Sequence, residues 1–332
     1  MLRYSAGTAG IRAAIGAVCF LWIGPSACVP GGGGQALFSG SSVSYQPGVV
    51  ATLERARRVL WVGAHPDDEV SSSGLLARAK HQGASLYLVS LTRGENSYDL
   101  WGGLRRGSEI GRSRAALFAQ AASVLHADGF ELGPFTNGPW IHGELDLLPA
   151  DAPHRDWAAG TAADDVIRKW RKEGDPVAYL VDLLRRVRPD VVVALDHHCG
   201  VTGHKEHMAL ARLLVEAIKS VSDSDTGLKV GSVIYSARVT PDLVACGFCT
   251  CEGEAPLQPA EEVGTAGLMP EYGLTEAGVA CLVARTYEQT MLGRRWSEEQ
   301  LREPCSEEAA HSAGLGRSGP FPPEVYRLYG LP

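Results

Sequence analysis

An abrupt change from apolar to polar residues limits the folds open to this chain more than any other feature. Residues 59–64 read Val-Leu-Trp-Val-Gly-Ala, and residues 65–69 read His-Pro-Asp-Asp-Glu. The apolar run predicts a buried strand, and the polar cluster stands directly at its end. Imidazole and carboxylate oxygen together are ligands that suit Zn²⁺, and a further carboxylate beside them can accept a proton from water.

The same five residues have a purely structural interpretation. Pro66 fits the first position of a helix, where the acids that follow would complement the helix dipole by about 0.3–1 kcal/mol each. This interpretation explains the proline and the carboxylates but leaves His65 unexplained. A metal site therefore requires further ligands elsewhere in the chain.

A second apolar run supplies them. Residues 191–195 read Val-Val-Val-Ala-Leu, and the following loop leads to His204 and His207 at the start of a helical pattern over 203–220, capped by Thr202 or Gly203. The carboxyl ends of parallel strands meet at one edge of a sheet. We therefore expect His65 and Asp68 to meet one of His204 and His207 there. His197 and His198 are either partners that orient the ligands or loop residues, and the second interpretation is favoured.

Strands and helices alternate along the chain, which predicts an α/β fold: a Rossmann-like, mostly parallel sheet flanked by helices, with loop insertions and a C-terminal extension. No Gly-x-Gly-x-x-Gly motif follows the first strand, so a dinucleotide is not implied. The polar segment 149–176 reads as an insertion over the site, with Trp157 and Trp170 expected to pack rather than to stack on sugars. The predicted strands are 58–64, 85–92, 129–133, 190–195 and 231–237, and the predicted helices are 66–82, 107–126, 175–187 and 203–220.

These motifs resemble the PIG-L/LmbE-like family of zinc-dependent N-acetylglucosaminyl deacetylases. Residues 64–69, Ala-His-Pro-Asp-Asp-Glu, match the first family signature, and residues 203–207, Gly-His-Lys-Glu-His, match the second. Weaker matches are the strand end at 91–95, Arg114, and a C-terminal helix around 284–289. The resemblance spans roughly residues 57–292.

The resemblance implies a role for each matched residue. His65, Asp68 and His207 match the zinc ligands, Asp67 matches the general base, and His204 matches the imidazole that stabilises the oxyanion or protonates the leaving group. Zn²⁺ is the implied cofactor, although Fe²⁺ or Co²⁺ suits the same ligands. The implied substrate contacts are Arg114, Arg93 and Asn137.

The chain departs from the family pattern in three places. Glu206 stands where the family often has Asp, Asn137 where an acid is usual, and Leu117 where Glu is common. None of these changes removes a metal ligand or the base, but those at 117 and 137 alter the substrate pocket.

The N-terminal residues read as an export signal. Arg3 and Arg12 precede the apolar stretch 13–23, which is short for a membrane span, and small residues lead to Cys28. We expect a signal peptide over 1–28 with Cys28 as a lipid-bearing residue, simple cleavage or a misassigned start being the alternatives. The remaining domains are a Gly/Ser-rich linker over 29–48, the deacetylase domain over 49–300, and a C-terminal tail over 301–332 packed on it.

Cysteine usage fits an exported chain, which we place in the periplasm or on the cell surface, lipid-anchored. Disulfide bonds are favoured for the later cysteines, although Cys246, Cys249 and Cys251 have spacing that a structural zinc site also uses. Cys199 lies in the site loop, where a disulfide or an inert thiol is favoured over a metal contact. The cysteines concerned are Cys199, Cys246, Cys249, Cys251, Cys281 and Cys305.

The sequence therefore predicts a metal-dependent hydrolase that removes the N-acetyl group from an N-acetylglucosamine-containing conjugate, an amino-sugar or glycan substrate, with Asp67 as the base on zinc-bound water. Two alternatives keep the same residues: a broader N-acyl amidase, and a surface glycan-binding protein without turnover. The net charge of −7 and the scattered arginines argue against nucleic-acid binding.

Overall fold

The computed structural model describes residues 48–97, 104–149, 161–224, 230–236, 261–264, 267–292 and 324–330, with residues 152, 155, 157, 228 and 252. The predicted signal peptide and lipid site, almost all of the linker, and Cys246, Cys249, Cys251 and Cys305 lie outside these residues. Among the residues that are described, no helix is both long and apolar enough to cross a membrane.

The secondary structure alternates as the sequence predicts through the first two-thirds of the chain. In chain order the elements are α1 (Val49–Leu53), β1 (Arg58–Gly63), η1 (Asp68–Ser72), α2 (Ser73–His81), β2 (Ser85–Ser90), α3 (Ser108–Val124), β3 (Gly129–Leu132), α4 (Glu144–Leu147), α5 (Ala163–Glu173), α6 (Pro176–Val187), β4 (Val191–Leu195), α7 (Gly200–Gly203), α8 (Lys205–Ser224), β5 (Ser232–Ser236), β6 (Glu261–Val263), β7 (Leu268–Met269), β8 (Leu274–Thr275), α10 (Glu276–Leu292) and β9 (Glu324–Gly330).

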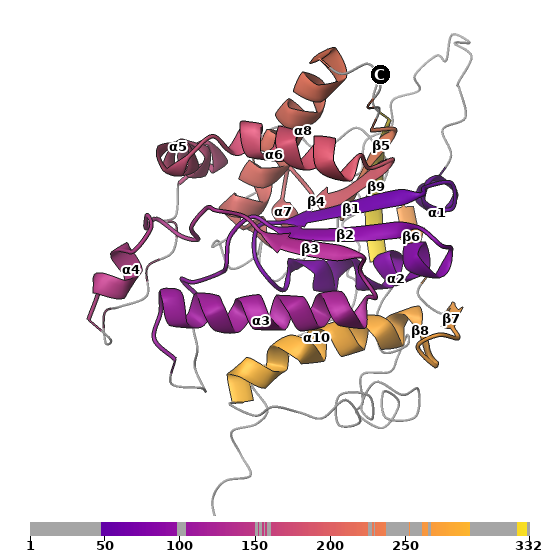
Figure 1. Ribbon diagram of the computed structural model, residues 1–332, viewed down its shortest axis with the longest axis horizontal. Helices are drawn as coiled ribbons and strands as arrows, with labels where there is room; N and C mark the ends of the chain where they lie inside the picture. The colour runs from indigo at the N-terminus through magenta and orange to yellow at the C-terminus, as the bar shows by residue number, and fades with distance from the viewer. Residues whose placement is uncertain are drawn as a thin grey trace, which may run out of the picture. The chain divides into compact units, whose positions relative to one another are not determined.

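A seven-stranded sheet in the order β3-β2-β1-β4-β5-β9-β6 organises the described residues (Figure 1). The first five strands in this order are parallel, with Val62 level with Ala194 across the β1–β4 pair. β9 and β6 extend the sheet in antiparallel pairing beyond β5. This confirms the predicted Rossmann-like, mostly parallel α/β fold. It also makes β9, from the segment expected as a C-terminal tail, a strand of the main sheet.

Helices cover both faces of the sheet, which explains why the central strands β1 and β4 carry continuous apolar runs. Helices α5, α6 and α8 lie over one face, and α2, α3 and α10 lie over the other (Figure 1). Alternate residues of β1 divide between these layers: Leu60 and Val62 face the first, and Val59 and Trp61 face the second. A strand with both faces buried needs no polar alternation, so its sequence reads as an unbroken apolar run.

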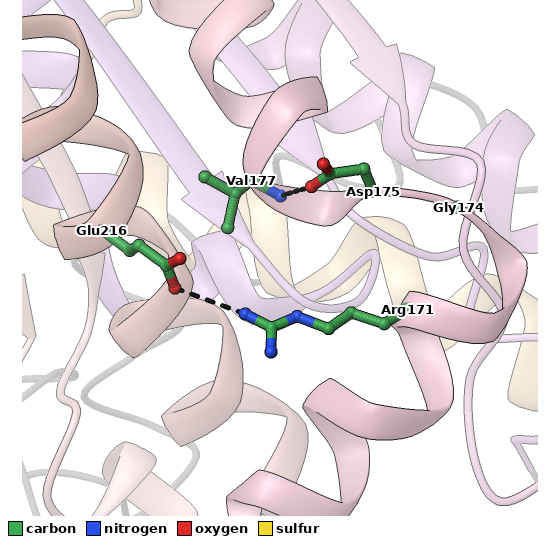
Figure 2. Close-up of a pocket in the computed structure, with 5 residues that line it drawn as sticks. All are labelled: Arg171, Gly174, Asp175, Val177 and Glu216. Carbon is green, nitrogen blue, oxygen red and sulfur yellow. Dashed lines mark hydrogen bonds and ion pairs between the residues drawn. The ribbon is translucent and has the colours of Figure 1, made fainter.

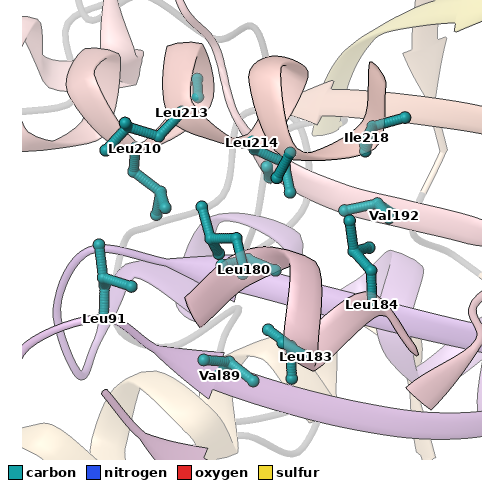
Figure 3. Packing of buried hydrophobic residues seen from close by; sticks show 14 of the residues in the cluster. Val89, Leu91, Leu180, Leu183, Leu184, Val192, Leu210, Leu213, Leu214 and Ile218 are labelled. Atoms are coloured by element: carbon teal, nitrogen blue, oxygen red, sulfur yellow. The ribbon is translucent and has the colours of Figure 1, made fainter. Parts of the chain in front are cut away.

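Branched apolar side chains of α6 and α8 pack together over one face of the sheet (Figure 3). Leu180 and Leu184 of α6 meet Leu214 and Ile218 of α8, and all four are almost fully buried. Burying a side chain of this size stabilises the fold by about 1.5–3 kcal/mol. α6 also has a strong start, because the Asp175 carboxylate accepts hydrogen bonds from the backbone amides of residues 177 and 178.

Two predicted elements differ from the structure. The helix predicted over 66–82 is split into the short 3₁₀ turn η1 and the helix α2, because Asp67 has φ +107°, which no helix accommodates. The segment 149–176 is not solely a loop over the site: α5 begins at Ala163, and Trp170 is fully buried in the core. The packing interpretation of Trp170 is confirmed, and its indole donates a hydrogen bond to the Thr136 carbonyl.

Candidate metal centre and active site

The two histidine-bearing loops lie at the point where the strand order of the sheet reverses. β1 and β4 are neighbours, and the chain winds outward from them in opposite directions, to β2 and β3 on one side and to β5 on the other. Open α/β sheets place their binding sites outside the carboxyl ends of the strands at this point. The connection after β1 carries residues 64–68, with Asp68 beginning η1. The connection after β4 passes through α7 into the first turn of α8, which carries His207.

Three side chains from these loops come within hydrogen-bonding range of one another. His65 Nδ1 lies 3.2 Å from His207 Nε2. His207 Nε2 lies 3.0 Å from Asp68 Oδ1, and His65 Nδ1 lies 3.5 Å from Asp68 Oδ2. We call these three residues the ligand triangle. Each of their side chains is less than 10% exposed.

The remaining polar atoms of the ligand triangle are held by protein acceptors and donors. His207 Nδ1 donates to the Gly200 carbonyl at 2.7 Å, and His65 Nε2 donates to Glu206 Oε2 at 2.5 Å. Asp68 Oδ2 accepts the backbone amides of Ala64 and His65. With these tautomers His207 Nε2 and His65 Nδ1 keep their lone pairs directed at the triangle, the arrangement that metal-binding histidines need.

The spacing of the ligand triangle suits a small divalent cation. Zinc binds nitrogen and oxygen at about 2.0–2.2 Å, so the atoms of a tetrahedral set lie about 3.3–3.5 Å apart. The observed separations of 3.0–3.5 Å are close to this range. Two imidazoles and one carboxylate therefore fit a metal ion, with one position left for a non-protein ligand.

His204 stands beside the ligand triangle and creates a second possible ligand set. Its ring nitrogen and those of His65 and His207 all lie within 4.8 Å of one another. That limit is looser than a shared coordination sphere requires, and the side chain of His204 is 27% exposed, more than the buried triangle. We favour the triangle with Asp68 because it supplies a negative charge and shorter separations.

Glu206 is the buried anion that supports this centre. Oε2 accepts hydrogen bonds from His65 and from Asn137 Nδ2 at 2.7 Å, and Oε1 accepts the Gly138 amide at 2.8 Å. Burial raises the pKa of Glu206, but the hydrogen bond and charge of His65 and the charges of His204 and Lys169 outweigh it, so the pKa lies well below its ordinary value. Glu206 is thus a carboxylate with no exposed surface, satisfied by three donors.

Asp67 occupies the loop between the ligand triangle and Arg114. Its carboxylate pairs with Arg114 Nη2 at 2.9 Å, and its side chain is 43% exposed. Arg114 Nη2 also donates to the Pro66 carbonyl. Gly94 has φ +61°, and a side chain there would collide with the Arg114 guanidinium, so glycine at this position lets Arg114 reach Asp67.

Asn137, predicted as a substrate contact, has both polar side-chain atoms engaged inside the protein. Nδ2 donates to Glu206, and Oδ1 accepts the Asn96 amide at 3.0 Å. Only 6% of Asn137 is exposed. By contrast Arg93, which follows β2, is exposed.

The strands and loops that form this centre lie inside a segment that matches a protein-family model. Residues 60–218 match the model described as PIG-L: GlcNAc-PI de-N-acetylase. These residues belong to the PIG-L family. The PIG-L segment contains the ligand triangle, Asp67, His204, Arg93, Arg114 and Asn137, and it ends within α8. α10, which the sequence resemblance included, lies beyond it.

Curated relatives that match this chain are named as deacetylases of a 2-acetamido-2-deoxy-glucopyranoside. A 1D-myo-inositol 2-acetamido-2-deoxy-alpha-D-glucopyranoside deacetylase of Acidothermus cellulolyticus is 32% identical over 189 residues, covering 54% of this chain and 60% of that protein. Its counterpart from Rhodococcus jostii is 30% identical over 180 residues, covering 51% and 55% respectively. The chain thus spans no more than about 60% of the length of these relatives.

Solved structures share the fold of the PIG-L segment and its surroundings. A deacetylase in complex with teicoplanin, from the teicoplanin biosynthesis pathway, matches with a TM-score of 0.50 at 14% identity, over 83% of this chain and 99% of that one. A second structure of a deacetylase from that pathway has a TM-score of 0.50 at 16% identity, over 82% and 98%. At these identities the likeness concerns the fold.

The residues around the PIG-L histidines separate into site and scaffold. His198 Nδ1 pairs with the Glu252 carbonyl at 2.7 Å, which supports the interpretation of His198 as a loop residue. Cys199 is disulfide-bonded, as is Cys281, so the expectation of a disulfide or inert thiol over a metal contact at Cys199 is confirmed. Leu117 packs in the core on the α3 side of the sheet.

Two functional partners were not assigned from the sequence. Glu206 appeared there only as a departure from the family pattern, yet it binds His65. Tyr287 of α10 donates a hydrogen bond to Glu69, the last acid of the first motif. Both contacts join positions far apart in the chain, so no local spacing in the sequence reveals them.

An open hollow on the outside of the helical layer is unrelated to this centre. It has a volume of about 490 Å³ and is lined by Arg171, Gly174, Asp175, Val177 and Glu216 (Figure 2). Arg171 pairs with Glu216 at 3.6 Å, and Asp175 caps α6. Glu216 follows His207 by nine residues along α8, a rise of about 14 Å. The hollow therefore lies well away from the ligand triangle along α8.

Proposed function

We propose that this chain is a metal-dependent hydrolase that removes the N-acetyl group from an N-acetylglucosamine-containing conjugate. The observation that carries the proposal is the ligand triangle of His65, Asp68 and His207, with separations of 3.0–3.5 Å and Asp67 next to it in the chain. The curated relatives are named as deacetylases of a 2-acetamido-2-deoxy-glucopyranoside, and these names support the same reaction.

The ligand triangle would hold the metal, and Glu206, Gly200 and the backbone amides of residues 64 and 65 would fix its ligands. When bound, such a cation supplies Lewis acidity: it lowers the pKa of water and polarises an amide carbonyl. We propose Zn²⁺, with Fe²⁺ and Co²⁺ as ions that the same donors accept.

Asp67 would act as the general base. Its carboxylate is partly exposed and lies beside the ligand triangle, so it is available to take a proton from the attacking water and deliver it to the departing amine. The ion pair with Arg114 Nη2 at 2.9 Å orients the Asp67 carboxylate for the first of these transfers. A carboxylate serving both steps needs no second acid.

His204 would serve the carbonyl oxygen of the substrate. Its ring lies against both His65 and His207, with centroid distances of 4.7 and 4.9 Å, and its side chain reaches solvent. A hydrogen bond donated there stabilises the negative charge that develops on the oxygen. Loss of one such donor typically costs about 10²–10³ in rate.

Among the three predicted sugar contacts, Arg93 is the best candidate. Arg114 and Asn137 are engaged with Asp67 and Glu206, whereas the Arg93 side chain is exposed at the end of β2. Arg93 follows the carboxyl end of β2, and β2 is the parallel neighbour of β1, whose carboxyl end leads to His65 and Asp68. We propose that its guanidinium contacts hydroxyl groups of the conjugate.

We further propose that the enzyme acts outside the cytoplasm, held at the membrane by a lipid on Cys28. The disulfide bonds of Cys199 and Cys281 support an oxidising compartment. The basic and apolar pattern of residues 1–28 supports export.

Acetate release from a panel of N-acetylglucosamine conjugates, including an inositol glycoside and compounds with longer N-acyl chains, tests the reaction. Metal-loaded protein should release acetate and chelated protein should not. The variant Asp67→Asn should keep its metal and lose nearly all turnover, whereas a glycan-binding protein would keep its affinity for the sugar. The hydrolase proposal fails if no N-acyl compound is cleaved with Zn²⁺, Fe²⁺ or Co²⁺.

A further inference from the structure

The backbone of Asp67 is held in a conformation that a residue with a side chain rarely adopts. Its φ is +107° and its ψ is −15°, in a loop where Pro66 precedes it and the 3₁₀ turn η1 follows. Conformations of this kind cost about 1–3 kcal/mol and persist only where surrounding contacts enforce them.

The side chain of Glu69 binds the Asp67 backbone directly. Glu69 Oε2 accepts the Asp67 amide at 3.1 Å, two residues earlier in the chain. Glu69 has no exposed surface, and its other oxygen, Oε1, accepts the hydroxyl of Tyr287. The carboxyl group of Glu69 is therefore fixed through one oxygen by Tyr287 and binds the Asp67 amide through the other.

Tyr287 reaches Glu69 from a helix outside the PIG-L segment. α10 packs against α2, α3 and η1, and Tyr287 is 8% exposed. The start of α10 is anchored to α2, because Glu276 accepts hydrogen bonds from Arg78 at 2.6 and 2.7 Å and is 2% exposed. The position of the Tyr287 hydroxyl is thus set by a buried ion pair as well as by packing.

We infer that Tyr287 and Glu69 are positioning residues, which together clamp the Asp67 backbone and so aim its carboxylate. The inference rests on the proposed function, in which Asp67 is the base. Neither residue touches the substrate: Tyr287 acts through Glu69, and Glu69 acts through the Asp67 amide. Arg114 holds the carboxylate of Asp67 separately. The contact with Glu69 thus fixes the Asp67 backbone, and the contact with Arg114 fixes the Asp67 carboxylate.

The variants Tyr287→Phe and Glu69→Leu test the clamp. Each should lower kcat by at least about tenfold while KM and the metal content stay within about twofold, because a shift of about 1 Å in a catalytic group can cost 10²-fold. Tyr179→Phe is a matched control: its hydroxyl donates to Glu131 at 2.6 Å, another tyrosine–glutamate pair, away from the loops of the site. The control should leave kcat unchanged.

The variant Glu69→Gln separates geometry from charge. Its amide oxygen can accept the Asp67 amide while its amide nitrogen donates to the Tyr287 oxygen, so the clamp should survive and kcat should stay within about threefold of the wild type. A Gln variant as slow as the Leu variant would overturn the clamp, and so would Tyr287→Phe behaving like Tyr179→Phe.

Crystal structures of the variants provide a readout independent of turnover. In Glu69→Leu, φ at Asp67 should leave the left-handed region, and in Tyr179→Phe it should stay there. An unchanged φ in Glu69→Leu would overturn the inference. If instead the wild-type protein cleaves no N-acyl sugar, the proposed function fails, and the same structures still decide whether the clamp exists.

Discussion

At the scale of single residues, three consecutive acids occupy three different surroundings. Burial raises the pKa of Asp68, but the imidazoles of His207 and His65 outweigh it and hold the pKa well below its ordinary value. Burial raises the pKa of Glu69 to about 8 despite its hydrogen bond from Tyr287. Asp67 instead faces the Arg114 guanidinium at partial exposure. Three neighbours in sequence thus have surroundings that suit the roles proposed for them: metal ligand for Asp68, buried support for Glu69 and general base for Asp67.

The roles of the two histidines on either side of Lys205 and Glu206 are separable by substitution. We predict that His207→Ala loses most of its metal, because it removes a corner of the ligand triangle. His204→Ala should keep about one metal per chain and lose about 10²–10³-fold in kcat, the cost of a missing oxyanion donor. Metal content after dialysis, measured by elemental analysis, checks this; equal metal loss in both variants would favour a three-histidine set.

A carboxylate at position 137 should conflict with Glu206. In Asn137→Asp two buried carboxylates would lie about as close as the present 2.7 Å contact, so one of them would take up a proton in the folded state. The pKa of that group would then be higher in the folded protein than in the unfolded chain. At pH values between these two pKa values, the folded protein would bind more protons than the unfolded chain. Stability therefore falls as pH rises through that window.

We predict that Asn137→Asp lowers the free energy of unfolding by about 1–3 kcal/mol at pH 8 and by less at pH 5. Asn137→Ala, which removes the donor without adding a charge, should show a loss that changes little with pH. Denaturant unfolding of both variants at the two pH values measures the difference. Parallel losses at pH 5 and pH 8 would contradict the prediction.

At the scale of elements, the connection from β4 to α8 depends on unusual backbone. Gly200, Val201 and Gly203 all have positive φ, at 55°, 63° and 78°. This turn brings the Gly200 carbonyl to His207 Nδ1, the contact that orients the ring. The helix begins only at Lys205, so His204, expected in its first turn, stands before it with an extended backbone.

A side chain at position 200 should damage the ligand triangle. A Cβ there would lie 2.8 Å from the Cβ of His207. Gly200→Ala should therefore weaken metal binding by at least about tenfold, the lower limit typical of lost supporting contacts. Gly83→Ala is the matched control, because Gly83 also has positive φ, at 89°, but nothing lies within 4 Å of an added Cβ.

Both variants should lose roughly 1 kcal/mol of stability for the strained φ. Only Gly200→Ala should change the dissociation constant for the metal, which competition with a chromophoric chelator measures. Equal affinities in the two variants would mean that the position of His207 does not depend on this turn.

The elements that the sequence predicts well are those with local signals. The continuous apolar runs of β1 and β4 follow from burial on both faces, and the helical period of α8 follows from one apolar side. α5 was hidden in a polar segment, since most of its turns face solvent and only a few residues such as Trp170 enter the core. β9 was not predicted, because charged residues interrupt its short sequence, Glu-Val-Tyr-Arg-Leu-Tyr-Gly, and leave no continuous apolar run.

The candidate site divides in the same way. The motif at 65–69 and the histidines at 204 and 207 stand out by residue type, and the topology of a parallel sheet brings strand ends together. The pairing of His65 with Glu206 and of Glu69 with Tyr287 depends on how α8 and α10 pack. Asn137 was expected to face the substrate, and its use inside the protein depends on Glu206 being long enough to reach it.

At the scale of the whole molecule, two disulfide-bonded cysteines lie in very different places. Cys199 is in the loop that supplies Gly200 and His204, while Cys281 is in α10. We predict that reduction lowers the free energy of unfolding by about 2–4 kcal/mol for each bond broken. Cys199→Ser should also weaken metal binding, whereas Cys281→Ser should affect stability alone; chelator competition and denaturant unfolding distinguish them. An identical metal affinity in all forms would contradict this.

The strand β9, formed by Glu324–Gly330, is the strand that pairs with the outer edge of β5. It lies between β5 and β6, although residues 237–323 separate it from β5. During synthesis on the ribosome the outer edge of β5 therefore stays open until these last residues emerge. Translation of an mRNA truncated before that point would yield a polypeptide in which the edge of β5 stays unpaired. An unpaired strand edge can pair with other chains and so promote aggregation.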